Sequence, residues 1–339
     1  MYASLTTLLV LAAQCGSDHD HHRPQRFEAR QPHMGAVFDI VLYAANSDTA
    51  DRAFSAAFRR IAELDDMMSD YDPDSELSRL SRSSPTESPV AISEDLVRLL
   101  DQAASLSKHS EGAFDVTVGP LTRLWRRARR QQRFPDSQRL AQARTAVGFR
   151  YLKLDVAGRT AELARPQMLL DLGGIAKGYA ADAAVAVLRR AGIERALVNA
   201  GGDIATSGAP PDERGWKIGI APLQPKAPPS RFIILADTAV ATSGDAWQFV
   251  EIAGERYSHI LDPRTGIGLT RRSSVTVVAP DGTTADGLAS AVSVLGPQRG
   301  FELIEQIPGT GALLVQVEGD QVRVYQSARF QQLAQPTDP

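Results

Sequence analysis

The hydrophobic positions change their spacing several times along the chain, which predicts both helices and strands. Residues 36–44 (AVFDIVLYA) are rich in β-branched side chains and alternate enough to predict a strand. Residues 48–69 and 93–110 have apolar positions at helical spacing behind residues that can cap a helix. After the Gly-Gly pair at 173–174, an Ala-rich stretch predicts a third helix, which ends at Gly192.

Apolar runs of strand length dominate the second half of the chain and are mostly joined by Gly, Asp or Pro. We predict strands within residues 194–208, 215–223, 231–244, 274–280, 311–319 and 321–326. Strands in runs, with helices placed irregularly between them, favour an α+β fold with mixed sheets flanked by helices over a doubly wound one. The absence of a long linker or repeat predicts a two-lobed single catalytic domain over residues 27–332, followed by a flexible tail, residues 333–339.

Composition narrows the class of protein. With 339 residues, of which 43% are hydrophobic and 23% charged, the chain has the composition of a globular protein. A formal net charge of -3 gives no general basic field, so we expect no nucleic-acid partner. Residues 123–134 (RLWRRARRQQRF) are strongly basic. We interpret them as a solvated helix face, with docking to an acidic partner or to anionic lipid as alternatives.

The amino terminus predicts an export signal. Residues 4–15 (SLTTLLVLAAQC) are apolar but far shorter than the roughly 18 to 20 residues that span a bilayer. Cys15 is the only cysteine and is followed by a polar stretch, an arrangement that resembles a bacterial lipoprotein signal with a tether up to residue 26. Gln14 and the lack of Lys or Arg before the apolar stretch depart from that pattern. A simple cleaved signal, or a cysteine without function, are the alternatives.

Residues 171–178 (DLGGIAKG) are the first candidate for chemistry. A glycine turn at a helix start exposes backbone groups that no helical bond satisfies, and the helix dipole favours an anion there. The segment is therefore a candidate phosphate or cofactor cradle, although it lacks the P-loop pattern. Close helix packing at the glycines and a surface role for Lys177 are the alternatives.

Residues 284–296 (TADGLASAVSVLG) are the second candidate. They predict a helix capped by Thr284 and ended by Gly296, with Asp286 and Ser290 four residues apart on one face. A carboxylate, a hydroxyl and a nearby carbonyl make a sparse oxygen site, which suits Mg²⁺. A capping aspartate and a packing face of small residues are the alternative.

Four of the six histidines lie in the polar tether or just after it, which leaves His109 and His259, in YSHILDPRTG, further along the chain. His259 precedes a rigid Asp-Pro turn and is a candidate proton acceptor, with a structural histidine as the alternative. Two turn-rich segments, 67–80 and 112–121, place an aromatic side chain beside Asp. Stacking combined with hydrogen bonding suits a nucleotide or flavin, although ordinary loops also contain such pairs.

Eight motifs occur in an order and spacing that resemble those of the FAD:protein FMN transferase (ApbE) family, over about residues 30 to 310. They are HMGAVFDI, SDYDPDSELSRL, GAFDVTVGPL, DLGGIAKGYAAD, NAGGDIATSG, VATSGD, HILDPRTG and ADGLASAVSVLG. The resemblance implies an enzyme that splits FAD at its pyrophosphate and transfers FMN to a Ser/Thr hydroxyl of another protein, with Mg²⁺ and release of AMP. It also implies an FAD site between the two lobes.

The same resemblance implies roles for particular residues. The positions that match FAD contacts are Met34, Tyr71, Ala113, Phe114, Asp115, Asp171, Lys177 and Ile260. The positions that match the metal site are Asp286, Ser290 and the carbonyls of Gly174 and Ala289. His259 matches the general base. The family more often has Thr where this chain has Ser290, and the hydroxyl is retained.

Two other functions fit the same residues: a Mg²⁺-dependent FAD pyrophosphatase that yields FMN and AMP, and a lipoprotein that binds FAD without chemistry. For the transferase, the resemblance implies an acceptor with an Asp-x-x-Ser/Thr-Gly-Ala-Ser/Thr motif, and we expect a membrane redox subunit. That motif is absent from this chain. We expect an exported protein on the periplasmic face of the bacterial inner membrane, lipid-anchored at Cys15.

Overall fold

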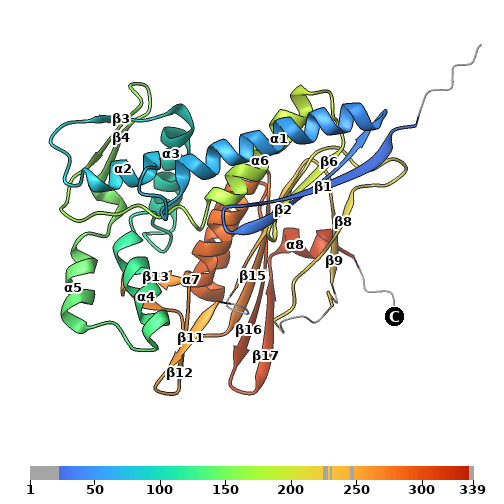
Figure 1. Cartoon of the computed structure of the whole chain (residues 1–339). Helices are drawn as coiled ribbons and strands as arrows, with labels where there is room; N and C mark the ends of the chain where they lie inside the picture. The colour runs from blue at the N-terminus through green and yellow to red at the C-terminus, as the bar shows by residue number, and fades with distance from the viewer. Residues whose placement is uncertain (1–22, 224–227, 230, 245–247, 336–339) are drawn as a thin grey trace, which may run out of the picture.

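The centre of the protein is an eight-stranded sheet whose neighbouring strands are antiparallel (Figure 1). The computed structural model describes residues 23–223, 228–229, 231–244 and 248–335. In spatial order the strands are β1 (Gln25–His33), β2 (Ala36–Ala44), β6 (Ala196–Ala200), β7 (Asp203–Thr206), β10 (Ala239–Gly244), β15 (Ser273–Ala279), β16 (Gly311–Glu318) and β17 (Gln321–Gln326). The predicted α+β fold class is confirmed, but this sheet is antiparallel and not mixed.

Three helices cover one face of this sheet and enclose the largest apolar core. They are α1 (Ser47–Met68), α6 (Ala176–Arg190) and α7 (Gly282–Gln306). In α1 the buried positions recur three and four residues apart, so the helix presents one apolar stripe to the sheet. The buried face of α6 is largely alanine and glycine, which lets it lie close to α1 and α7.

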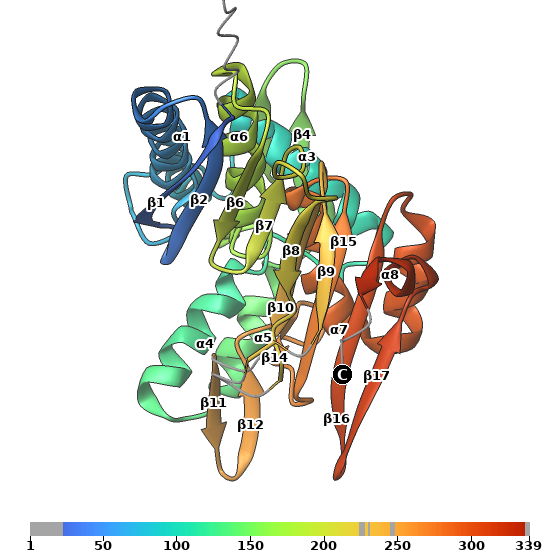
Figure 2. The ribbon, with the colours of Figure 1, turned by 90° about the vertical axis from the view of Figure 1, so that its right-hand side faces the viewer.

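The opposite face is covered by a three-stranded antiparallel sheet and a short helix (Figure 2). These elements are β8 (Trp216–Gly219), β9 (Phe232–Leu235), β18 (Ala334–Gln335) and α8 (Ala328–Leu333). Phe330 of α8 is fully buried against Val278 and Leu313 of the large sheet, within a second apolar cluster. The large sheet is therefore covered on both faces.

The remaining elements extend from one side of this sandwich (Figure 1). They are α2 (Glu76–Arg82), β3 (Val90–Ala91), α3 (Glu94–His109), α4 (Gly119–Gln131), α5 (Ser137–Thr145), a 3-10 helix (Phe149–Tyr151), β4 (Leu152–Asp155), β5 (Thr160–Leu163), β11 (Phe249–Ile252), β12 (Glu255–Ser258), β13 (Leu261–Asp262) and β14 (Ile267–Gly268). A third apolar cluster joins α4 and α5 to β11, β12 and β13, and so forms a smaller lobe with its own core.

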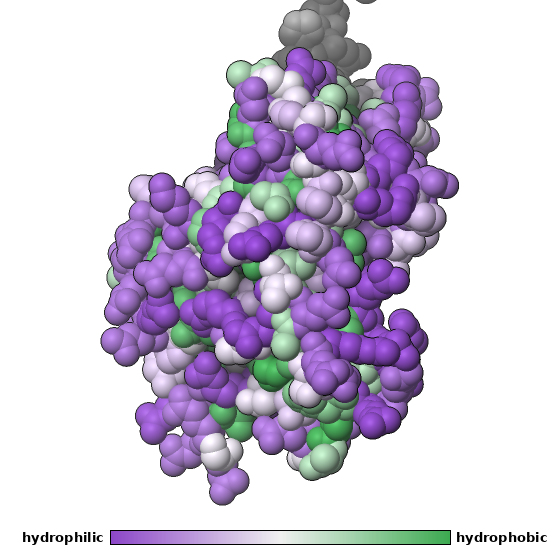
Figure 3. Space-filling view, turned by 90° about the vertical axis from the view of Figure 1, so that its left-hand side faces the viewer, coloured by the Kyte–Doolittle hydropathy of each residue, from purple (hydrophilic) through white to green (hydrophobic). Residues whose placement is uncertain are grey.

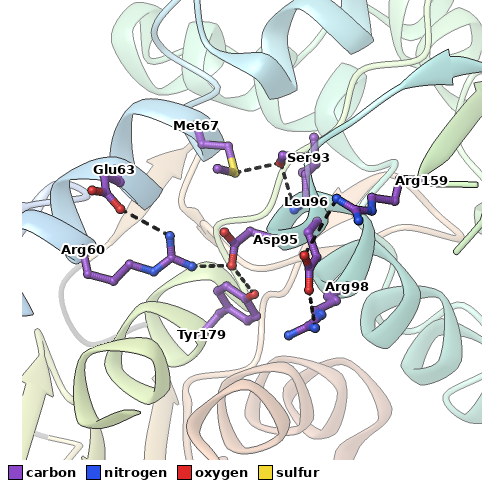
Figure 4. A network of polar contacts seen from close by, with 10 residues as sticks. Arg60, Glu63, Met67, Ser93, Asp95, Leu96, Arg98, Arg159 and Tyr179 are labelled. Atoms are coloured by element: carbon purple, nitrogen blue, oxygen red, sulfur yellow. Dashed lines mark hydrogen bonds and ion pairs between the residues drawn. The ribbon is translucent and has the colours of Figure 1, made fainter. Parts of the chain in front are cut away.

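Asp95, in the first turn of α3, connects three helices (Figure 4). Its carboxylate accepts a hydrogen bond from the Tyr179 hydroxyl of α6 at 2.7 Å and pairs with Arg60 of α1. Burial raises the pKa of Asp95, but Arg60 and Tyr179 outweigh burial and hold it below its usual value. The network therefore ties α3 to α1 and α6, two of the three helices that lie on the large sheet.

Most predicted elements form close to their expected positions. The predicted strand 36–44 coincides with β2, and helices 48–69 and 93–110 match α1 and α3 to within one residue at each end. Residues 194–208 form a hairpin, β6 and β7, and residues 231–244 form β9 and β10 rather than one strand each. In both cases a residue between the two strands has positive φ: Gly201 and Gly202 in the β6–β7 hairpin, and Asp237 where the chain passes from one sheet to the other.

The start and end of α7 differ from the prediction. Asp281, not Thr284, caps the helix, because the Asp281 side chain accepts a hydrogen bond from the Thr284 N–H at 2.8 Å. Gly296 has a φ of 76° and breaks the helical geometry, yet helix resumes at Pro297 and continues to Gln306. The glycine therefore marks a kink and not the end, since proline is well suited to the first position of a new helical segment.

The predicted domain boundaries fall near the ends of the described chain. Strand β1 begins at Gln25, and residues 334–335 pair with β9. The proposed signal and Cys15 lie outside the described residues, as does the end of the predicted tail. Among the described residues, no helix is long and apolar enough to cross a membrane.

Candidate active site

The amino-terminal ends of α6 and α7 cross at two glycines. A Cβ added to Gly178 would lie 2.1 Å from the Gly282 carbonyl oxygen, so only glycine permits this approach. Asp182 of α6 accepts hydrogen bonds from the N–H groups of Gly282 and Thr283 at 2.6 and 2.8 Å. Burial raises the pKa of Asp182 to about 6 despite these bonds. The crossing fixes the relative positions of the DLGGIAKG segment and α7.

Three oxygen-bearing residues meet beside this crossing. Asp286 and Ser290 lie one turn apart on α7, as predicted, and Asp286 is 5% exposed. A Cβ added to Gly174 would lie 3.0 Å from Ser290 Oγ and 3.4 Å from a ring carbon of Phe114. Gly174, Ser290 and Phe114, which come from three separate motifs, therefore surround one small space.

Two of these oxygens are open to a ligand. The Gly178 N–H, which in a continuous helix would bond to the Gly174 carbonyl, donates to Asp286 Oδ2 at 3.2 Å instead. Within the described residues, neither the Gly174 carbonyl nor Ser290 Oγ has a hydrogen-bond partner. A carboxylate, a hydroxyl and a carbonyl form the hard oxygen set that suits Mg²⁺, so these residues fit such an ion.

The Ala289 carbonyl, the fourth metal ligand that the resemblance implies, already has a hydrogen-bond partner. The Ala289 carbonyl accepts a hydrogen bond from Ser293 Oγ at 2.8 Å and lies inside α7, so a metal ion would have to share this oxygen. The described residues hold no group of three or more His, Cys, Asp or Glu side chains that could bind a metal. A metal in this site therefore depends on the hydroxyl and the carbonyls as much as on Asp286.

Lys177 lies between two buried carboxylates. It forms an ion pair with Asp203, which is 2% exposed at the start of β7. Burial alone would lower the pKa of Lys177, but Asp286 and Asp203 raise it above its ordinary value. Burial and the neighbouring Asp203 raise the pKa of Asp286 to about 7, although Lys177 opposes this shift. Lys177 is a permanent cation at the helix start, suited to phosphate oxygens.

A second group of predicted residues surrounds Arg126 of α4. The Arg126 guanidinium lies 4.2 Å from the centre of the Tyr71 ring, pairs with Asp70 at 2.5 Å, and is 3.7 Å from Asp171 Oδ2. Asp171 also accepts a hydrogen bond from the Gly173 N–H at 2.8 Å. Tyr71 is 76% exposed, so it has ring surface available for stacking. Arg126 thus brings together side chains from three segments.

The GAFD segment lies between these two groups. Ala113 and Phe114 are buried, and Phe114 contributes its ring edge to the space beside Gly174. Asp115 accepts hydrogen bonds from Thr117 Oγ1 at 2.7 Å and from the Phe149 N–H at 2.7 Å, and burial raises its pKa despite them. Both of its carboxylate oxygens therefore hold the local backbone in place.

Met34 lies in the turn between β1 and β2, where it and Gly35 both have positive φ. Its N–H donates to Asp65 of α1 at 2.7 Å, which holds the turn against the helix. The Met34 side chain packs against the largest apolar core. Its proximity to a cofactor stays a prediction.

His259 lies in the smaller lobe, between β12 and β13. Its backbone N–H and its Nδ1 are each 3.0 Å from the Gln248 carbonyl oxygen. Because a carbonyl only accepts hydrogen bonds, we assign the proton to Nδ1, which leaves the basic lone pair on Nε2. The next residue, Ile260, is fixed by bonds from its N–H to Ser258 Oγ at 3.1 Å and from the Leu269 N–H to its carbonyl at 2.9 Å.

Comparisons with known proteins show which family the chain belongs to. Residues 34–314 match the model of the ApbE family. The chain belongs to the ApbE family. It is 36% identical to the FAD:protein FMN transferase of Vibrio cholerae, over 88% of this chain and 90% of that one, and 33% identical to that of Haemophilus influenzae, over 80% and 82%. The structure of flavin transferase ApbE from Vibrio cholerae matches with a TM-score of 0.82 and 33% identity, covering 91% of this chain and 99% of that one.

Two residues of this ApbE chain were given no role by the sequence. Asp203 lies in the NAGGDIATSG motif, and only the fold brings it to Lys177, 26 residues away. Arg126 lies in the basic stretch that we interpreted as a solvated face, yet its side chain points to Asp70, Tyr71 and Asp171. The position of Asp203 in the NAGGDIATSG motif is a sequence signal that could have identified it as a candidate site residue. Nothing in the sequence distinguishes Arg126 from the other arginines of α4.

We predict that Gly178→Ala destabilises this ApbE chain by about 1–3 kcal/mol, because the new Cβ meets backbone atoms of α7 that cannot move independently. Urea unfolding followed by circular dichroism measures the change. As a control, Ala183→Ser adds one atom to a half-exposed position of α6 and should change the stability by less than about 0.5 kcal/mol. Equal stability of Gly178→Ala and the native protein would contradict the close crossing of α6 and α7.

Proposed function

We propose that the chain transfers FMN from FAD to a Ser/Thr hydroxyl of an acceptor protein, forming a phosphoester and releasing AMP, with Mg²⁺. Family membership supports an FAD:protein FMN transferase. The observation that carries the proposal is the oxygen set of Gly174, Asp286 and Ser290, which lies next to the cationic Lys177. Phosphoryl-type transfer depends mainly on positioning and charge neutralisation, and this arrangement provides both.

Each group of residues has its own part in the reaction. Asp286, Ser290 and the Gly174 carbonyl would hold Mg²⁺, with Ala289 as a further carbonyl. The ion, when bound, supplies Lewis-acid activation of the pyrophosphate and offsets charge on the departing AMP. Lys177, paired with Asp203, neutralises phosphate oxygens at the start of α6.

His259 takes the proton from the acceptor hydroxyl in this proposal. The Gln248 carbonyl holds the ring by Nδ1, so Nε2 accepts the proton as the oxygen attacks the FMN phosphorus. The bond from phosphorus to the bridging oxygen then breaks, and AMP leaves. The site would lie between the smaller lobe, which carries His259, and the main sandwich.

The flavin half of FAD is assigned to the group around Tyr71. Its aromatic ring, supported on Arg126, suits stacking, and Asp171 suits hydrogen bonding. The other residues assigned to FAD by the resemblance are Met34, Ala113, Phe114, Asp115 and Ile260. Asp115 acts in this proposal through the loop that it holds.

Arg126→Gln should weaken FAD binding about tenfold, because Tyr71 loses a cation–π contact and the carboxylates of Asp70 and Asp171 lose the cation between them. Burial and Asp171 already raise the pKa of Asp70, so the two carboxylates repel one another. Quenching of FAD fluorescence measures the affinity. Arg59→Gln, at an exposed position of α1, should leave it unchanged. An unaltered FAD affinity of the Arg126→Gln variant would show that Arg126 has no role in FAD binding.

We further propose an exported, lipid-anchored protein at the periplasmic face of the inner membrane. The apolar residues 4–15 and Cys15 support this location. The acceptor would be a membrane redox subunit with an Asp-x-x-Ser/Thr-Gly-Ala-Ser/Thr motif. Membrane fractionation of the full chain and of Cys15→Ser tests the anchor, and an unchanged membrane fraction would exclude it.

The central experiment mixes residues 24–339 with FAD, Mg²⁺ and a protein that carries the acceptor motif, and then records the intact mass of the acceptor. A gain of one FMN, with release of AMP, supports the transferase. Accumulation of free FMN and AMP without a mass gain would identify a pyrophosphatase. Intact FAD that stays bound would identify a carrier.

A further inference from the structure

The α4 helix carries an exposed row of arginines beside the segment that holds His259. Arg123, Arg127 and Arg130 are spaced four and three residues apart and are all exposed, so they lie along one side of the helix. None of the three side chains forms an ion pair or hydrogen bond with another described residue. We call these three residues the basic face.

The segment that contains α4 and α5 is far more basic than the rest of the chain. Residues 119–145, from α4 through α5, contain eight arginines and one acidic residue, Asp136, whereas the whole chain has a net charge of -3. The side of the molecule that carries α4 and α5 has a mostly hydrophilic surface (Figure 3). A concentrated positive field on a chain of negative net charge favours an anionic partner at this place.

The opposite side of α4 is packed directly against the His259 segment. The Trp125 ring is 5.1 Å from that of Tyr257, and Trp125 Nε1 donates to the Gly266 carbonyl at 2.8 Å. Tyr257 and Gly266 lie on either side of His259 in the sequence. A stable protein interface covers about 800 Å² on each partner, a patch roughly 16 Å in radius. A footprint of that size centred on the His259 segment extends over the neighbouring α4.

We propose that the basic face docks the acceptor protein, by pairing with acidic residues around the target hydroxyl. This inference rests on the proposed function. An anionic membrane is the other partner that would suit the charge. The start of β1, which follows the proposed anchor, lies at the opposite end of the molecule from α4 in both ribbon views (Figures 1 and 2). The position of α4 beside the His259 segment therefore favours the acceptor.

The test compares Arg123→Glu/Arg127→Glu with Arg52→Glu/Arg59→Glu, which makes the same charge change at exposed positions of α1. A motif-bearing acceptor with acidic flanking residues serves as the probe, together with a version in which Asn and Gln replace those residues. We expect the α4 pair to raise the KM for the acidic acceptor about tenfold at low salt, with little change for the neutral version. The α1 pair should behave as the native chain does.

Two further measurements keep the outcomes separate. Direct binding of the acceptor to the FAD-loaded chain tests docking even where no transfer occurs, so a failure of the proposed function does not decide the docking question. Circular dichroism checks that the charge-reversal variant is folded. If it misfolds, Arg123→Gln/Arg127→Gln is used in its place. Equal acceptor affinity in the native and α4 variants overturns the proposal. Loss of binding to phosphatidylglycerol vesicles with unchanged acceptor affinity would assign the face to the membrane instead.

Discussion

His259→Ala should lower the rate of FMN transfer about 10²–10⁴-fold while leaving the affinity for FAD within about twofold of the native value. The imidazole is needed only to take the proton of the incoming hydroxyl. The groups assigned to FAD, around Tyr71 and Lys177, lie on other elements than His259. Single-turnover transfer to a motif-bearing acceptor and FAD fluorescence quenching give the two quantities.

The matched control for this substitution is His109→Ala. His109 lies at the end of α3, where its Nδ1 is 2.8 Å from the Ser105 carbonyl oxygen, the same kind of contact that His259 makes. His109→Ala should transfer FMN at the native rate. A native rate for His259→Ala, with FAD bound normally, would show that another group accepts the proton.

Asp286→Asn should abolish the dependence on Mg²⁺ and lower the transfer rate by about 10³-fold or more, since a bound metal contributes several kcal/mol to the stabilisation of the transition state. The amide keeps the shape of the side chain but removes the charge. Lys177 keeps its pairing with Asp203, so the fold of α6 should persist. Rates measured across a Mg²⁺ titration test this, and a native, metal-responsive rate would exclude the assigned site.

The same carboxylate predicts how metal affinity changes with pH. Burial and Asp203 raise the pKa of Asp286 to about 7 in the metal-free protein. A metal ion binds the ionised form, so protons compete with Mg²⁺ below that pKa. Apparent Mg²⁺ affinity should be constant above about pH 7.5 and fall up to about tenfold per pH unit below 7. Calorimetric titration at pH 6 and pH 8 measures it, and equal affinities would contradict the raised pKa.

The Asp286→Asn result is best compared with Asp182→Asn. Asp182 is a partly buried carboxylate with a raised pKa at the same helix crossing, but its oxygens accept hydrogen bonds from the amino terminus of α7. We expect Asp182→Asn to reduce stability while retaining the response to Mg²⁺. The pair therefore separates loss of a metal ligand from loss of a structural carboxylate.

Local sequence patterns predicted much of the fold because strands and helices depend on residues within one or two turns. The apolar stripe of α1 and the alternation in β2 identified these elements almost to the residue. The Asp281 cap was missed because Asp281 and Thr284 both lie before the apolar stretch, and either can cap a helix. The hairpin β6 and β7 was read as one strand because its Gly-Gly turn is so short.

The sequence by itself determined the fold class, the family and the identity of most candidate site residues, since each motif carries its residue types at fixed local spacing. Only the tertiary structure decided that Gly174 faces Ser290, that Lys177 pairs with Asp203, and that Arg126 reaches Tyr71. These pairs are far apart in the chain. Their contacts depend on how whole helices pack, which local periodicity does not encode.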